Sequence, residues 1–285
     1  MTTTFPLGPY TVSRVGFGAM QLPGAGVFGP PRDHDQAIAV LKRAVELGVD
    51  HIDTAQFYGP NVSNELIREA LHPYAENLAL VSKVGARRND EGEWIAAQQP
   101  DELRADIEEN LATLGTDRLA AVNLRIHSGD PNSVGAVDHE LFDRQLTAMI
   151  AARDEGLIAG IGLSSVSIDH LRIALDRTEI VTVQNAYNLV DRSSQPVLDL
   201  CTERGISFVP FFPLGSGFNA DNPVLGNAAV KQAAADLGRT PAQIALAWTL
   251  SVAPNVLLIP GTSSVAHLEE NIAISDIELP ADFTP

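Results

Sequence analysis

The sequence is short of cysteine, of basic residues and of long apolar runs, and each shortage excludes a class of function. The single cysteine, Cys201, cannot form an intrachain disulfide, and no cysteine cluster indicates a zinc site. Lys and Arg number 19 against 36 Asp and Glu, which gives a formal net charge of −17. Without a basic stripe to meet phosphates, nucleic acids and anionic membrane surfaces are poor partners. No run is long and apolar enough to cross a bilayer.

Residues 1–10 lack the basic region and apolar run of a signal peptide. Together with the lone cysteine, this predicts a cytoplasmic protein with no metal site that acts on a small molecule. The sequence does not indicate an oligomeric state.

The sequence does hold enough apolar material for a large core, since 45% of its 285 residues are hydrophobic. Short β-rich apolar runs alternate with longer stretches of helical period, which predicts βαβ units and a parallel sheet. The predicted strands are residues 14–19, 49–53, 78–83, 120–126, 159–163, 180–184, 207–211 and 256–259. The predicted helices are residues 35–47, 63–71, 100–114, 139–154, 168–176, 195–203 and 241–251.

Glycine marks the passage from helix to strand at Gly48, Gly156 and Gly205, where a left-handed C-cap is needed. No composition shift or long linker divides the chain, so residues 1–285 are predicted to form a single domain. Residues 5–15 predict an N-terminal hairpin that could plug the bottom of a barrel. The pattern alone leaves a closed barrel and an open sheet as alternatives.

Residues 24–29 match the G-x-G-x-x-G fingerprint of dinucleotide-binding folds. A true fingerprint follows a strand directly and opens a helix whose N-terminus holds the pyrophosphate. Here Pro30 and Pro31 follow at once, and the helix is predicted to start several residues later. We therefore interpret the segment as a loop after the first strand that could wall a substrate pocket.

Ionisable side chains stand at or just after the ends of successive predicted strands, where an α/β barrel holds its active site. Asp53 ends the second strand, Tyr58 follows five residues later, and Lys83 ends the third strand. Hydride attack on a carbonyl creates an alkoxide, which needs a proton donor or a positive field. A phenol can donate the proton when a lysine cation stabilises the phenolate, and an aspartate can hold that lysine charged. Each residue alone is more typical of packing or ion pairing, so only the set indicates chemistry.

These residues belong to longer motifs that resemble those of the aldo-keto reductases over essentially the whole chain. The motifs are Gly16-Phe17-Gly18-Ala19-Met20, Val49-Asp50-His51-Ile52-Asp53-Thr54-Ala55-Gln56-Phe57-Tyr58-Gly59, Ser82-Lys83-Val84-Gly85, Gly162-Leu163-Ser164-Ser165, Gln184-Asn185, Pro213-Leu214-Gly215-Ser216-Gly217 and Ile259-Pro260-Gly261-Thr262. The resemblance implies an α/β protein, a (β/α)8 TIM barrel with an N-terminal β-hairpin. It implies an oxidoreductase that exchanges hydride between a nicotinamide cofactor and a small carbonyl compound or alcohol. In that enzyme Tyr58 would be the general acid, tuned by Asp53 and Lys83.

The fourth predicted strand departs from the family pattern. Arg125 stands where the resemblance implies a histidine, and His127 lies two residues on, on the same face of the strand. We expect Arg125 to fill the position beside the carbonyl oxygen as a permanent cation. The alternative, in which His127 is the fourth catalytic residue, stays open.

The resemblance also implies where the cofactor binds. Ser164, Ser165 and Gln184 would meet the nicotinamide amide, and Phe211 would stack on its ring. The helix N-terminus and hydroxyls near residue 262 suit a 2′-phosphate, which predicts NADPH, but Gly261 and His267 replace the family's lysine and arginine, so NADH stays open. Further cofactor contacts are predicted for Gly18, Ala19, Met20, Asp53, Pro213, Leu214, Gly215, Ser216, Gly217, Ile259, Gly261, Thr262, Ser263, Ser264, His267, Glu270 and Asn271.

Within the family, the segments Met20-Gln21-Leu22-Pro23-Gly24, Asn123-Leu124-Arg125 and Pro210-Phe211-Phe212-Pro213-Leu214-Gly215 are similar to those of bacterial pyridoxal reductases. That similarity implies reduction of pyridoxal to pyridoxine. Two other functions are alternatives: an aldolase-type lyase in which Lys83 forms a Schiff base, and a non-catalytic sensor that binds NADPH. A lyase does not need Tyr58 at this spacing, and a non-catalytic sensor does not need Asp53, Tyr58 and Lys83 all intact.

Overall fold

The computed structural model describes residues 3–126, 134, 136–215, 222–281 and 283–285. Its central feature is a parallel sheet of seven strands in the order β11-β10-β9-β8-β5-β4-β3. Each strand overlaps a predicted one. They are β3 (Phe17–Gly18), β4 (His51–Asp53), β5 (Ala79–Val84), β8 (Ala121–Arg125), β9 (Ile161–Ser164), β10 (Thr182–Ala186) and β11 (Ser207–Phe211).

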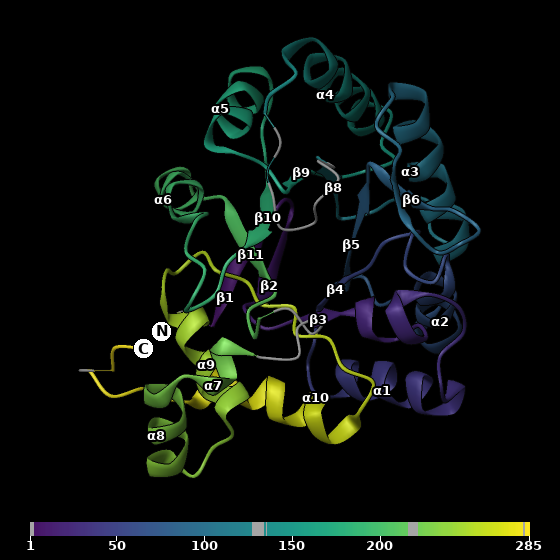
Figure 1. Cartoon of the computed structure of the whole chain (residues 1–285). Helices are drawn as coiled ribbons and strands as arrows, with labels where there is room; N and C mark the ends of the chain where they lie inside the picture. The colour runs from purple at the N-terminus through teal and green to yellow at the C-terminus, as the bar shows by residue number, and fades with distance from the viewer. Residues whose placement is uncertain (1–2, 127–133, 135, 216–221, 282) are drawn as a thin grey trace.

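The eighth predicted strand, residues 256–259, joins the two edges of this sheet through isolated parallel bridges. Val256 pairs with Phe208 of β11, and Leu258 pairs with Val15, just before β3. The sheet is therefore closed into a barrel rather than left open (Figure 1). The bridges are single pairs, which is why this segment is not a regular strand of the ladder.

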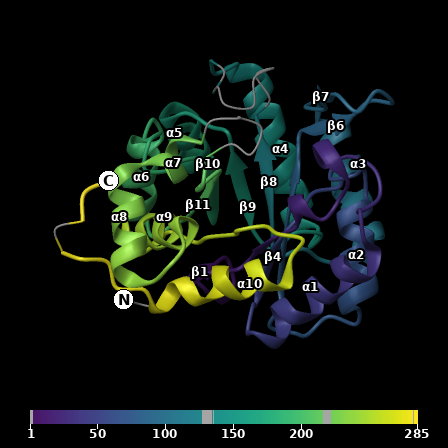
Figure 2. The ribbon, with the colours of Figure 1, turned by 60° about the horizontal axis from the view of Figure 1, so that its bottom comes forward.

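Helices cover the outside of the barrel (Figure 1). The predicted ones appear as α1 (His34–Glu46), α2 (Val62–Leu71), α3 (Pro100–Leu114), α4 (His139–Asp154), α5 (Ile168–Arg177), α6 (Gln195–Arg204) and α9 (Pro241–Ser251). The last helix, α10 (Val265–Ile272), contacts both α9 and α1 and so completes the ring (Figure 2). Among the described residues, none of the helices is both long and apolar enough to span a membrane.

The N-terminal hairpin consists of β1 (Thr4–Leu7) and β2 (Tyr10–Ser13), paired antiparallel. Its side chains Leu7 and Val12 are buried in a cluster with Ala79 and Ala121. Those alanines are the first residues of β5 and β8, so the hairpin fills the end of the barrel at which the strands begin. The opposite end, where the strands finish, is left for the active site.

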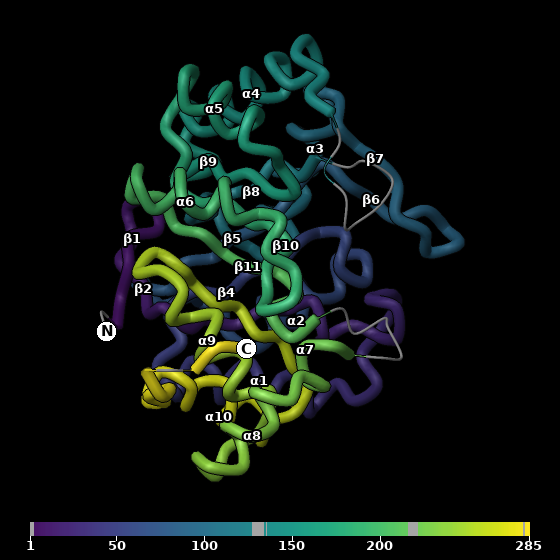
Figure 3. Tube along the Cα trace, turned by 60° about the vertical axis from the view of Figure 1, so that its left-hand side comes forward, coloured from purple at the N-terminus to yellow at the C-terminus, as the bar shows by residue number. Residues whose placement is uncertain are grey.

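Several described elements carry no clear pattern in the sequence. The hairpin of β6 (Ala86–Arg88) and β7 (Trp94–Ala96) follows β5, and Figure 3 shows it reaching outward beyond the helices. Helices α7 (Pro223–Gly226) and α8 (Ala228–Leu237) precede α9 and pack on it. Short 3-10 turns, η1 (Ala19–Gln21), η2 (Ala25–Val27) and η3 (Ala273–Asp276), complete the fold.

Residues 24–29 form a loop and not a strand-to-helix turn, as predicted. Helix α1 begins only at His34, where the Asp33 side chain accepts from Gln36 N at 2.9 Å and caps the helix. The loop instead lies against the segment after β4, since Gly29 N donates to Gly59 O at 2.9 Å. It therefore adjoins Tyr58, the residue before that glycine.

Candidate active site

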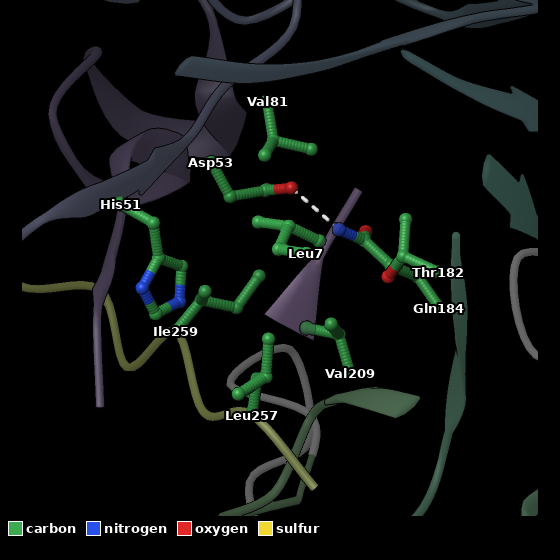
Figure 4. A pocket seen from close by; sticks show the side chains of 9 residues that line it. All are labelled: Leu7, His51, Asp53, Val81, Thr182, Gln184, Val209, Leu257 and Ile259. Atoms are coloured by element: carbon green, nitrogen blue, oxygen red, sulfur yellow. Dashed lines mark hydrogen bonds between the residues drawn. The ribbon is translucent and has the colours of Figure 1, made fainter. Parts of the chain in front are cut away.

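Asp53 and Lys83 form a buried ion pair at neighbouring strand ends. Their side chains are 4% and 5% exposed, and the Lys83 ammonium donates to Asp53 Oδ1. It also donates to the backbone oxygen of Thr54 at 3.0 Å. The second carboxylate oxygen, Asp53 Oδ2, accepts from Gln184 Nε2 at 2.6 Å, as Figure 4 shows. A charge pair so far from water is tolerated because hydrogen bonds replace its hydration.

Tyr58 lies beside this pair. Its ring centroid is 5.0 Å from Lys83 Nζ, and only 5% of the residue is exposed. Burial lowers the pKa of Lys83, but the Asp53 carboxylate and the Tyr58 hydroxyl raise it by more, so the pKa of this lysine lies above its ordinary value. The structure thus brings a phenol next to a lysine that stays charged, the arrangement needed to stabilise a phenolate.

The turn after β4 fixes Tyr58. Its backbone N donates to Ala55 O at 3.1 Å, and its ring packs edge-on against Phe57 with centroids 5.3 Å apart. Gly59 follows with φ +104°, and a Cβ at that position would lie 2.3 Å from Val62 Cβ. The turn therefore requires glycine directly after the tyrosine.

Arg125 ends β8, opposite Ser164 of β9. Its Nε is buried and has no hydrogen-bond partner, and no carboxylate of the described ranges forms an ion pair with it. Burial lowers the pKa of Arg125 below its ordinary value, against the opposing effect of Tyr58. His127 lies outside the described residues, and the assignment of the fourth catalytic position to Arg125 stays a prediction.

Three residues predicted to meet the nicotinamide carry buried polar atoms without partners. These are the hydroxyls of Ser164 and Ser165 and the amide oxygen Oε1 of Gln184. Ser164 pairs with Gln184 between β9 and β10, and Ser165 N donates to Gln184 O at 2.9 Å, so the three lie together. Buried polar atoms are nearly always hydrogen-bonded, so this group indicates a missing partner. A carboxamide, which both donates and accepts, fits it.

The barrel interior beneath Asp53 is nearly filled. A cavity of about 10 Å³ remains, room for about one water molecule. Figure 4 shows the residues that line it, which are Leu7, His51, Asp53, Val81, Thr182, Gln184, Val209, Leu257 and Ile259. This cavity is too small for a substrate, so the chemistry belongs above Asp53, at the strand ends.

The end of β3 approaches the loop before α10 backbone to backbone. A Cβ on Gly18 would lie 2.4 Å from Ile259 O, and a Cβ on Gly261 would lie 2.5 Å from Gly18 O. Both positions therefore require glycine. Ala19 and Met20 follow in η1, and the Ile259 side chain lines the interior cavity. The predicted cofactor contact of Ile259 stays a prediction.

Phe211 ends β11 half-buried and packs edge-on against Phe212, with centroids 5.2 Å apart. The chain then turns, and Gly215 N donates to Phe212 O at 2.9 Å with Gly215 at φ +82°. Pro213 and Leu214 are half-buried in this turn. Ser216 and Gly217, the rest of the predicted pyrophosphate loop, lie outside the described residues.

At the start of α10 the predicted phosphate-binding residues divide into two kinds. Thr262 Oγ1 accepts from Ser264 N at 3.0 Å, and Ser264 Oγ accepts from His267 N at 3.4 Å, so both hydroxyls cap the backbone. Ser263 and His267 are exposed instead. A role of these two side chains in binding a phosphate stays a prediction. Glu270 and Asn271 are half-buried further along the helix.

Phe28, Arg88 and Trp94 form a wall beside Tyr58. Of these, only Phe28 lies in a segment that the sequence predicts as a pocket wall, residues 24–29. The Arg88 guanidinium carbon lies 4.1 Å from the Trp94 ring centroid and 5.5 Å from that of Phe28. Trp94 packs edge-on against Phe57 at 5.3 Å, so the wall adjoins the tyrosine turn. No motif joins these residues, because only the fold brings the β6–β7 hairpin against the loop of residues 24–29.

Comparison with known proteins agrees with this geometry. The model of the aldo/keto reductase family matches residues 14–284 of the chain. The chain belongs to the aldo/keto reductase family. It is 48% identical over 278 residues to a pyridoxine 4-dehydrogenase of Escherichia coli, covering 98% of this chain and 94% of that protein. It is 40% identical to an uncharacterized oxidoreductase of Schizosaccharomyces pombe, covering 98% of this chain and 87% of that protein.

Solved aldo-keto reductases share the fold. A thermostable member in complex with the inhibitor epalrestat is 27% identical, with a TM-score of 0.80 and coverage of 99% of this chain and 97% of that one. A member from Klebsiella pneumoniae in complex with NADPH is 24% identical, with a TM-score of 0.80 and coverage of 99% and 92%. Family membership confirms the predicted barrel and the predicted reaction class, a nicotinamide-dependent oxidoreductase acting on small carbonyl compounds.

Proposed function

We propose that this aldo/keto reductase uses NADPH to reduce pyridoxal to pyridoxine, with Tyr58 as the proton donor. The observation that carries the chemistry is the phenol of Tyr58 beside the buried Lys83–Asp53 pair. The substrate is supported by the similarity to pyridoxine 4-dehydrogenase over nearly the full length of both chains.

Tyr58, Lys83 and Asp53 each have a separate role in protonating the carbonyl oxygen. As negative charge develops on that oxygen, the Tyr58 hydroxyl donates its proton and becomes a phenolate. The charged Lys83 stabilises that phenolate, and Asp53 keeps the lysine charged and in position. A donor of this kind contributes ~10²–10⁴-fold to the rate.

The residues at the strand ends fit a nicotinamide cofactor. When bound, it supplies the hydride that the carbonyl carbon accepts. Ser164, Ser165 and Gln184 would hold the carboxamide through their unpartnered buried atoms. Ser263 and His267, exposed at the start of α10, would bind the 2′-phosphate that distinguishes NADPH from NADH.

Arg125 and the aromatic wall support an aromatic aldehyde with an adjacent anionic oxygen. Pyridoxal carries an acidic ring hydroxyl next to its aldehyde group, so two neighbouring oxygens can face one cation. Arg125, which is half-buried and whose buried Nε has no partner, suits that pair of acceptors. Trp94, half-buried and packed edge-on against Phe57 of the tyrosine turn, offers a surface for a planar ring.

The Schiff-base lyase is disfavoured by the state of Lys83. An amine must be neutral to attack a carbonyl, and here Asp53 and Tyr58 raise the pKa of the lysine instead of lowering it. The non-catalytic sensor lacks a specific observation in its favour, because the phenol, the lysine and the aspartate are all present and together.

The test is a panel of aldehydes assayed with NADPH and with NADH. We expect the highest kcat/KM for pyridoxal with NADPH, and a higher value for 2-hydroxybenzaldehyde than for benzaldehyde or 2-methoxybenzaldehyde. Turnover of other aldehydes but not of pyridoxal would contradict pyridoxal as the substrate and would still support reductase activity. Tight NADPH binding without turnover of any aldehyde would support the sensor.

A further inference from the structure

A hydrogen-bonded network lies behind the catalytic residues, on the side of α2 and α3. Its centre is Asn110 of α3, which is fully buried. Asn110 Oδ1 accepts from Ser82 Oγ at 2.6 Å and from Asn64 Nδ2 at 3.0 Å. Asn110 Nδ2 donates to Gln56 Oε1 at 2.9 Å and to Asp106 O at 2.8 Å, and it lies 3.5 Å from the backbone oxygen of Lys83. One side-chain amide thus uses two acceptor and two donor positions, its full capacity.

The partners of Asn110 adjoin the catalytic residues in the chain. Ser82 immediately precedes Lys83 in β5, and Gln56 stands two residues before Tyr58. Each is held directly by the Asn110 amide, so one group fixes both segments relative to each other.

The third connection reaches the aspartate. Asn64, bound to Asn110, accepts from Thr54 Oγ1 at 2.7 Å. Thr54 follows Asp53, and its backbone oxygen accepts from Lys83 Nζ at 3.0 Å. The network therefore ends on a residue, Thr54, whose backbone oxygen binds the catalytic lysine.

We propose that Asn110 is a positioning residue for the reaction: it sets the relative placement of Tyr58, Lys83 and Asp53 through their chain neighbours. The inference rests on the proposed roles of those three residues. It differs from a role in stability alone, because the segments of Tyr58 and Lys83 meet at one amide and the segment of Asp53 joins it through Asn64. Misplacement of reacting groups by about 1 Å can cost about 10²-fold in rate, so small shifts at these segments matter.

The test compares Asn110→Asp with Thr113→Val. The first change keeps the size of the side chain but replaces the two N–H donors by an acceptor, so the bonds to Gln56 and Asp106 are lost. Thr113 belongs to the same network, since its Oγ1 accepts from Asn64 Nδ2 at 3.0 Å, but it contacts neither Ser82 nor Gln56. It therefore reports the cost of disturbing the network away from the catalytic segments.

We expect Asn110→Asp to lower kcat about 10²-fold, with the dissociation constant for NADPH unchanged, while Thr113→Val keeps the kcat of the unaltered protein. In the Tyr58→Phe background, the same Asn110→Asp change should have little further effect on kcat, because it acts through that tyrosine. A purely structural role predicts lower Tm with unchanged kcat, or equal losses in both backgrounds, and either result overturns the proposal.

Should Asn110→Asp fail to fold, Ser82→Ala provides the same test, because it removes only the connection next to Lys83. A folded Ser82→Ala protein with unchanged kcat would then overturn the proposal, and a reduced kcat that vanishes in the Tyr58→Phe background would support it. Full turnover in Tyr58→Phe itself would instead reject the proposed function, so the two failures are distinguishable.

Discussion

The ammonium of Lys83 lies 5.0 Å from the ring centroid of Tyr58 while it is paired with Asp53. The pairing serves two purposes. It compensates a buried carboxylate, and it holds a cation next to the phenol that we propose as the proton donor. Variants of Lys83 and Asp53 can separate the effect of the pair on stability from its effect on catalysis.

Lys83→Met should leave Asp53 buried without its cation, which is expected to destabilise the fold by about 3–5 kcal/mol. Turnover should fall because the phenolate loses its stabilising charge. Adding Asp53→Asn to Lys83→Met should recover much of the Tm, since no uncompensated charge remains, but none of the turnover. Thermal unfolding and steady-state assays check the two effects, and recovery of turnover in the double variant would show that the pair serves stability alone.

Arg125 is expected to act as a fixed cation beside the carbonyl oxygen. Arg125→Met should lower kcat and kcat/KM together, because the interaction strengthens as charge develops in the transition state. Arg125→His should introduce a pH dependence of kcat with a midpoint near ~6.5, the ordinary range of histidine. His127→Ala should act mainly on KM. If His127→Ala abolishes turnover while Arg125→Met is nearly silent, the histidine and not the arginine fills the fourth position.

Cofactor choice should depend on the exposed side chains at the start of α10. NADPH is expected to bind more tightly than NADH. The difference should narrow in His267→Ala and in Ser263→Ala, because both side chains are exposed at the start of α10, where the phosphate is proposed to bind. His34→Ala, which removes an exposed histidine paired with Glu69, is the control. Titration of cofactor fluorescence measures all of these affinities. Equal affinities of the unaltered protein for NADPH and NADH would show that the start of α10 does not bind the 2′-phosphate.

Asp106 predicts a pH-dependent stability. Burial raises the pKa of this carboxyl from 3.8 to about 6, against the opposing effect of Arg87. The folded chain therefore keeps a proton on Asp106 that the unfolded chain releases at lower pH, so the stabilising contribution is full below about pH 4 and is lost as the pH rises through about 6.

Relative to Asp106→Asn, which lacks this titration, the free energy of unfolding of the unaltered protein should fall by up to about 3 kcal/mol between pH 4 and pH 7. Urea unfolding at a series of pH values measures this difference. Asp101→Asn, an exposed change in the same helix, is the control. A difference that stays constant with pH would contradict the raised pKa of Asp106.

Much of the barrel could be predicted because each unit carries local signals. Helix α3 begins at Pro100 and ends before Gly115, which adopts φ +69°, so both predicted bounds match the structure. The β6–β7 hairpin carries no such signal. Its strands are short and its turn is charged, and it is held by tertiary contacts such as that of Arg87 Nε with Asp106 Oδ1 at 2.7 Å.

The same division holds within the active site. Asp53, Tyr58 and Lys83 could be predicted because they stand at or just after the ends of two successive strands, where an α/β barrel holds its active site. The capping role of Thr262 and the central position of Asn110 could not, because each depends on which groups the fold places next to one side chain. Hydrogen bonds between residues distant in sequence, such as Asn110 with Gln56, leave no periodic trace.

The central claim is that Tyr58 donates the proton, and Tyr58→Phe tests it most directly. The change removes one hydroxyl oxygen and keeps the ring that packs against Phe57. With NADPH and pyridoxal, kcat is predicted to fall ~10²–10⁴-fold, while the dissociation constant for NADPH and the Tm stay close to those of the unaltered protein. A folded Tyr58→Phe protein that binds NADPH and reduces pyridoxal at nearly the original rate would contradict the account.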